Sequence, residues 1–367
     1  MGLQHNTGES VAFGKAPGLK QSQAEWRASR GIDTTNQIRL VELNHVRYRH
    51  ANIGKIVQFL EDFGFELVAR TDDKMYFRGY GRHHYDYVVE IGDQPKFLGG
   101  SFTVESLADL ERATQLDNAS PIQQLHDAPG GGQLVTILDP GGFPINLIFG
   151  QQRNEDLEPK APPQLLLNGE KVKSRLGACQ RFTRGPAAVY RVGHFGCCYK
   201  DFQVAWEWYL RNFNFVPSDI VYVGTEENHA VVASFLHIDR GEEFTDHHTF
   251  FLSESDNQRV HHCSFEVHDF DTQLLGHQWL ERKGYKTVWG VGRHLLGSQI
   301  FDYWRDTSNF MIEVSMSSMK SPSPVLTTNQ HYADGDLVNK DTPVMKIPAT
   351  NDMMQIWGPN RPTEWMS

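Results

Sequence analysis

The sequence predicts an α+β protein that is a tandem duplication of βαβββ modules. Its 367 residues suggest about two domains. Five landmarks in the first half recur in the same order in the second half. Within each copy, short alternating strands are interspersed with amphipathic helical stretches. These observations together favour two similar domains of mixed strands and helices.

The clearest repeat is a short strand with His at its second residue, followed by a helix and a Phe-x-Phe sequence. It occurs at 44–68 and again at 193–216. The other landmarks pair RHHYDYVV with DHHTFFLS, FTVESLADL with FEVHDFDTQL, and DPGGFPINL with DTSNFMIEV. The number of residues that separates the two members of a pair changes only slightly along the chain, as loop insertions would explain. We therefore interpret the pairs as one duplication.

Composition outside the repeats indicates connecting segments. The first residues are rich in Gly, Ser, Gln and Asn, and the segment between the copies carries charges and prolines. The turn-rich end contains Trp357 and Trp365, so we expect part of it to pack against the protein. The predicted organisation is an arm at 1–38, a first domain at 39–150, a linker at 151–188, a second domain at 189–318 and a tail at 319–367.

Charge and composition exclude several classes of protein. The formal net charge of −10 makes nucleic acid an unfavourable partner. No apolar run approaches 18 residues and the beginning of the sequence lacks the apolar core of a signal peptide, so we expect no membrane association. The four cysteines form no CxxC pair, which favours a reduced, cytoplasmic protein.

Two helices and two strands of the second copy can be placed from their patterns. A helix is expected at 202–210 after Asp201, and another at 271–284, opening at Asp271 and closing at Gly284. In the strand at 262–267, apolar residues occupy one face and polar residues the other. The strand at 310–315 likewise carries Glu313 opposite an apolar face. We expect the polar faces to line a cavity while helices cover the apolar faces.

The cavity-facing residues include three candidate metal ligands, His194, His262 and Glu313. Two neutral imidazoles and one carboxylate occupy one face of an Fe(II) ion and leave the opposite face open for other ligands. Spacing alone is a weak signal, because histidines also serve as ordinary core or surface residues. The neighbouring sequence adds the specificity.

The runs GHFGCCYKDFQVAWEWY, DHHTFFL, VHHCSFEVHDFD, GVGRHLLGSQIFDYWRD and FMIEV resemble the type I extradiol (catechol ring-cleaving) dioxygenases of the vicinal-oxygen-chelate, or glyoxalase, superfamily. The resemblance covers about residues 40–318. In the second half it rests on specific motifs, whereas in the first half only the order of the expected elements matches. It implies two domains, each of two βαβββ modules forming an incomplete barrel, with iron in the C-terminal domain.

The resemblance also implies a role for each candidate residue. The iron ligands would be His194, His262 and Glu313. His248 would be the acid/base, while His294 and Tyr303 would hydrogen-bond the substrate oxygens. The implied reaction, part of aromatic hydrocarbon catabolism, cleaves a catechol-type ring beside its two hydroxyls with O2. Fe(II) is the expected cofactor, with Mn(II) as an alternative, and a homo-oligomer is expected.

The first copy tests this interpretation. His45 aligns with His194, but Gly99 aligns with His262 and Asn146 with Glu313. Glycine has no side-chain donor and a neutral amide is a poor iron ligand, so the first domain is expected to be a metal-free structural partner.

Five other histidines are expected to have packing or solvent-exposed roles. Alternation directs His247 and His261 away from the metal, which favours packing roles. His237, His268 and His277 are expected on solvated turns or helix faces.

Two other functions fit the same ligand set. One is a 2-oxo-acid oxygenase similar to 4-hydroxyphenylpyruvate dioxygenase, which the GRH and FDYW runs disfavour. The other is a non-catalytic small-molecule-binding protein, which the presence of His248 and Tyr303 beside a complete triad disfavours.

Overall fold

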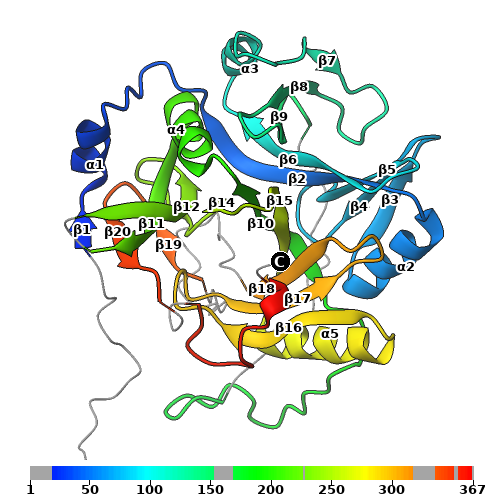
Figure 1. Ribbon diagram of the computed structural model, residues 1–367. Helices are drawn as coiled ribbons and strands as arrows, with labels where there is room; N and C mark the ends of the chain where they lie inside the picture. Colours follow the sequence, from blue (N-terminus) through cyan, green and yellow to red (C-terminus); the bar gives the residue numbers. More distant parts are fainter. Residues whose placement is uncertain (1–18, 153–167, 226–227, 317–334, 351–353, 366–367) are drawn as a thin grey trace, which may run out of the picture.

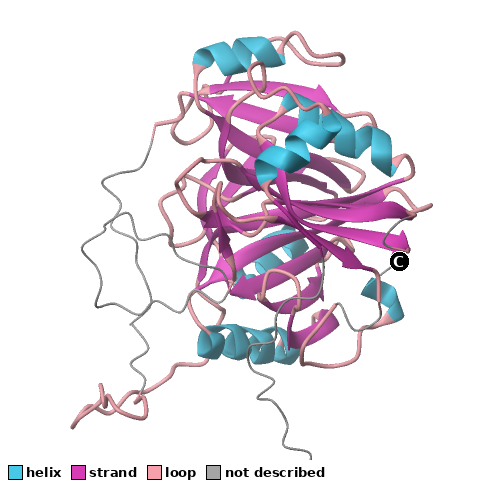
Figure 2. Cartoon of the chain, turned by 90° about the vertical axis from the view of Figure 1, so that its left-hand side faces the viewer, coloured by secondary structure: helices cyan, strands magenta, loops and turns pink. Residues whose placement is uncertain are grey.

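The computed structural model describes residues 19–152, 168–225, 228–316, 335–350 and 354–365. Outside the described residues lie about the first half of the predicted arm, residues 153–167 of the predicted linker and the beginning of the predicted tail. Two large curled sheets dominate the molecule, with helices at its periphery (Figures 1 and 2). The predicted α+β, two-domain architecture of incomplete barrels is confirmed.

The first half is an eight-stranded sheet in the order β3-β4-β5-β2-β6-β9-β8-β7. Its elements in chain order are β2 (Leu40–His50), α2 (Ile53–Phe63), β3 (Glu66–Arg70), β4 (Lys74–Arg78), β5 (Tyr87–Ile91), β6 (Lys96–Val104), α3 (Leu107–Ala113), β7 (Gln123–Gln124), β8 (Gln133–Leu138) and β9 (Pro144–Phe149). Strands β2 and β6 begin the two modules and pair antiparallel at the centre of the sheet.

The second half repeats this plan within a ten-stranded sheet in the order β1-β20-β11-β12-β14-β10-β15-β18-β17-β16. Its modules contain β10 (Val189–Tyr199), α4 (Phe202–Asn212), β11 (Phe215–Gly224), β12 (His229–Ile238), β13 (Thr245–Asp246), β14 (Phe250–Glu254), β15 (Arg259–Val267), α5 (Phe270–Arg282), β16 (Lys286–Arg293), β17 (Ile300–Arg305) and β18 (Met311–Met316). Strands β10 and β15 pair antiparallel as β2 and β6 do.

The two halves share one hydrophobic core. The ring of Phe195 on β10 lies 5.9 Å from that of Phe102 on β6. A Cβ at Gly100 would come within 2.2 Å of the Phe195 ring, so glycine is needed where the sheets approach each other. Where α2 meets α5, the buried Asp62 accepts hydrogen bonds from Trp279 Nε1 at 3.1 Å and Tyr285 Oη at 2.9 Å.

The ends of the chain add elements that periodicity did not predict. They are β1 (Leu19–Gln21), α1 (Gln23–Arg30), β19 (Leu337–Val338), β20 (Val344–Pro348) and the 3-10 turn η3 (Thr363–Trp365). Trp26 of α1 is buried beside Trp206 of α4. Strand β20 joins β1 to the second sheet, so residues more than 300 positions apart complete its edge.

The predicted helices form, but the capping of both differs from the prediction. Helix α4 begins directly after Asp201, although that side chain makes no capping hydrogen bond. Helix α5 begins one residue earlier than expected, because Asp269, not Asp271, accepts the hydrogen bond of Thr272 N at 2.7 Å. Gly284 follows its C-cap with φ 78°, a left-handed conformation that glycine adopts readily.

Candidate metal centre

Three strands bring the predicted ligands to one point. His194 lies on β10, His262 on β15 and Glu313 on β18, and all three are buried. The strand register places them side by side. Ser264 of the central strand β15 pairs with His194 on β10 at one side and with Glu313 on β18 at the other. Apolar partners on the opposite face of these strands, such as Phe265 and Ile312, enter the core as alternation predicts.

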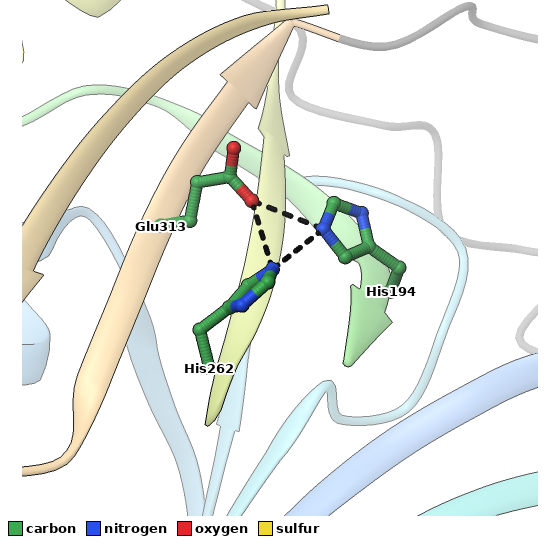
Figure 3. Close-up of side chains that lie close together, drawn as sticks. All are labelled: His194, His262 and Glu313. Carbon is green, nitrogen blue, oxygen red and sulfur yellow. Dashed lines mark hydrogen bonds and ion pairs between the residues drawn. The ribbon is translucent and has the colours of Figure 1, made fainter. Parts of the chain in front are cut away.

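The three side chains converge as metal ligands do (Figure 3). The Nε2 atoms of His194 and His262 are 3.0 Å apart, and Glu313 Oε2 lies 3.0 Å from the first and 3.5 Å from the second. Ligand atoms bound at about 2.1 Å and at right angles around one ion are about 3 Å apart. This spacing therefore matches one face of an octahedron, with the other face open.

The surroundings of Glu313 support a cation at this point. Its side chain is fully buried, and neither oxygen accepts a well-formed hydrogen bond from the described residues. Burial, together with neighbouring histidines, lowers the pKa of His262 well below its usual range, so that ring is neutral at neutral pH. Because a buried carboxylate without a charged partner is costly, the donor set fits a divalent metal.

The other predicted site residues lie around the same cavity. A pocket of about 410 Å³, a volume that includes its open mouth, is lined in part by five of them: His194, His248, His262, His294 and Tyr303. The ring of His248 is 4.2 Å from that of His194, and Tyr303 Oη is 3.0 Å from His294 Nε2. The structure therefore brings together all six residues that the sequence singled out.

His294 and Tyr303 have definite hydrogen-bonding roles. His294 Nδ1 lies 2.7 Å from the carbonyl oxygen of Met354, which can only accept, so Nδ1 carries the proton and Nε2 is the acceptor. Tyr303 donates its hydroxyl proton to that Nε2. Burial, and then the negative charge of Glu313, raise the pKa of Tyr303 well above its usual range, so the phenol remains protonated.

Two neighbouring histidines make hydrogen bonds to site residues that the sequence did not predict. His247 was expected only to pack, but its Nδ1 lies 3.1 Å from His248 Nδ1 and its Nε2 lies 2.7 Å from Asp219 Oδ2. Likewise, His261 Nδ1 lies 2.7 Å from His262 Nδ1. Neither contributes an atom to the triad, yet each orients the histidine that follows it, as outer ligand partners do.

The expectation that three other histidines are solvated was wrong for His237 and His268, whereas His277 is half-buried on its helix face. His237 is buried on β12, with Nδ1 2.8 Å from Ser218 Oγ. His277 of α5 lies 3.0 Å from the buried carboxylate of Asp302, and the side chain of His268 is only 7% exposed. Local periodicity does not reveal such burial, because Ser218 and Asp302, the partners of His237 and His277, lie on other elements.

The first copy shows the same register with different chemistry. Ser101 of β6 faces His45 and Asn146, as Ser264 faces the corresponding residues of the second copy. Asn146 Oδ1 accepts a hydrogen bond from Arg47 Nη1 at 3.1 Å. Gly99 has φ 103°, and a Cβ there would lie 2.7 Å from Asn146 Nδ2. This position therefore has no room for an imidazole.

Comparison with known proteins shows what the second domain is similar to. Residues 191–314 match the model of the Glyoxalase/Bleomycin resistance protein/Dioxygenase superfamily. Among the described residues, no helix is sufficiently long and apolar to cross a membrane.

One curated relative and several solved structures are similar to this chain. The chain is 30% identical over 131 residues to Metapyrocatechase 2 of Cupriavidus necator, a match spanning 36% of this chain and 35% of that protein. Its fold resembles homoprotocatechuate 2,3-dioxygenase from Arthrobacter globiformis, with TM-score 0.68, 16% identity, and 91% and 92% of the two chains covered. It also resembles the Mn(II)-bound glyoxalase from Novosphingobium aromaticivorans, with TM-score 0.67, 17% identity, and 89% and 93% covered. The resemblance to extradiol dioxygenases is thereby confirmed for the fold.

Proposed function

We propose that this chain is an extradiol dioxygenase that cleaves the ring of a catechol-type aromatic with O2 at a mononuclear Fe(II). The convergence of His194, His262 and Glu313 beside a pocket that also contains His248, His294 and Tyr303 carries the proposal. Mn(II) suits the same donors and is the alternative metal. When bound, the metal would supply adjacent positions for the two catechol oxygens and for O2.

The chain's own residues would prepare the catechol. Tyr303 remains a neutral donor and is suited to hold one substrate oxygen by a hydrogen bond. His294 has its proton fixed on Nδ1 by the Met354 carbonyl, and its Nε2 accepts the Tyr303 hydroxyl proton in this structure. Once Tyr303 turns to donate to the substrate, that Nε2 would accept a proton from a substrate hydroxyl. Together these groups would orient the ring and favour its ionised form.

His248 would act as the acid/base, and the structure supports a defined protonation state for it. Asp219 accepts the proton of His247 Nε2, which leaves His247 Nδ1 as an acceptor. His248 Nδ1 then donates to His247 Nδ1 across 3.1 Å. The remaining nitrogen of His248, Nε2, is left to take up a proton in the pocket and later return it.

The test is ring cleavage by the full-length protein reconstituted with Fe(II) under argon. Addition of air and a catechol should consume O2 and produce a yellow ring-fission product with both oxygen atoms incorporated. Absence of O2 uptake with every catechol tested, accompanied by consumption of a 2-oxo acid, would overturn the proposal. Mn(II) reconstitution in parallel identifies which metal supports turnover.

A further inference from the structure

The pocket wall beside the metal ligands is largely apolar. It is formed by Phe235 of β12, Phe251 of β14, Leu296, Met354 and Trp365. The rings of Phe235 and Phe251 lie 4.8 Å apart, and Trp365 lies 5.8 Å from Tyr303. A substrate chelated at the triad would place its ring substituents against this wall.

No lysine or arginine is found among the described residues that line the pocket. The nearest arginine in sequence to the site, Arg293, precedes His294 but is directed elsewhere. Its Nη1 donates to the carbonyl of Ser298 at 2.7 Å, and its guanidinium lies over the ring of Trp357. A substrate carboxylate in this pocket would therefore lose its hydration without gaining a cationic partner, which is strongly unfavourable.

One neutral polar side chain interrupts the apolar wall. Gln299 is buried, and its Oε1 has no hydrogen-bond partner among the described residues. It offers an acceptor for a hydroxyl group, but it carries no charge to balance an anion. The enclosed volume is small, about 30 Å³, so the pocket suits one ring with a short substituent better than a larger molecule.

From this lining we infer that the substrate is a single-ring catechol whose substituents are small and uncharged, such as methyl, halogen or hydroxyl. The inference rests on the proposed function and narrows its substrate class. It separates this chain from a protein of the same fold, the Brevibacterium fuscum homoprotocatechuate 2,3-dioxygenase, whose structure was determined with 3,4-dihydroxyphenylacetate, a carboxylate-bearing catechol.

Two measurements on the full-length, Fe(II)-loaded protein test the inference. The first is kcat/KM from O2 uptake with 4-methylcatechol and with 3,4-dihydroxyphenylacetate. The second is the dissociation constant of each compound measured anaerobically by optical titration, which does not require turnover. Both should favour 4-methylcatechol by on the order of a hundredfold or more, because only the acid buries an unpaired charge.

A charge introduced at the wall provides the converse test. Met354→Lys should raise the affinity for 3,4-dihydroxyphenylacetate relative to 4-methylcatechol by at least about tenfold, whereas the uncharged control Met354→Gln should not. The backbone carbonyl that binds His294 is retained in both variants.

The outcomes separate the two proposals. Equal or tighter binding of the acid by the unsubstituted protein would overturn the substrate inference. An unchanged preference in Met354→Lys relative to Met354→Gln would also contradict it. If neither catechol is cleaved, the proposed function fails, and the anaerobic dissociation constants still decide whether the pocket prefers uncharged rings.

Discussion

Replacing Glu313 by glutamine should affect the metal-free and metal-bound proteins in opposite directions. In the metal-free protein, the buried carboxylate has no well-formed hydrogen bond from the described residues and faces two imidazole nitrogens at 3.0 and 3.5 Å. Glutamine has nearly the same volume but no charge. Removing the cost of an unsatisfied buried charge should raise the free energy of unfolding by about 1–3 kcal/mol.

The same substitution removes the one anionic ligand of the proposed site. Changes to outer partners alone weaken metal binding by about 10–100-fold, so loss of a direct ligand should weaken it by at least about 100-fold. At a metal concentration about 100 times the dissociation constant of the unsubstituted protein, metal should stabilise that protein by about 2.7 kcal/mol. The variant should then gain only about 0.4 kcal/mol.

Anaerobic urea unfolding with chelator and with Fe(II), together with metal analysis of the dialysed protein, measures both effects. Asn146→Ala is the matched control, because Asn146 occupies the corresponding register position in the first copy. Its hydrogen bonds to Arg47 and Thr136 would be lost, so stability should fall equally with and without metal. One iron per chain and an undiminished metal-induced stabilisation in Glu313→Gln would refute the assignment.

Three further predictions concern the surrounding residues. His248→Ala should retain iron but lose at least about 100-fold in turnover; iron loss parallel to activity loss would contradict the acid/base role. Asp219→Asn should lower kcat by roughly tenfold and shift the pH profile of kcat with little change in KM, because His247 would no longer be held in one tautomer; an unaltered profile would argue against this positioning. Burial raises the pKa of Asp306 to about 7, so its contribution to stability is fully present below the unfolded pKa of about 3.9 and is lost as the pH rises through 7. Asp306→Asn should therefore stabilise the metal-free protein increasingly from pH 4 to 7, by up to roughly 1.4 kcal/mol per pH unit; a gain independent of pH in denaturant titrations would disprove this.

The sequence alone determined the repeat and the identity of the candidate ligands. Strand alternation is a local property with a period of two, so His262 and Glu313 could be assigned to a polar face before the sheet was seen. The ordered repeat similarly predicted that Gly99 and Asn146 replace ligand-type residues in the first copy. The paired registers of β6 and β15 agree with that alignment.

Only the tertiary structure decided how the rest of the site is completed. His247 hydrogen-bonds to Asp219 of β11, and His294 hydrogen-bonds to the carbonyl of Met354, which is 60 residues away along the chain. Trp365 reaches the pocket from a tail that has no counterpart in the repeat. Such contacts depend on how separate elements dock rather than on local periodicity, and for this reason the uncharged wall of the pocket became visible only in the folded chain.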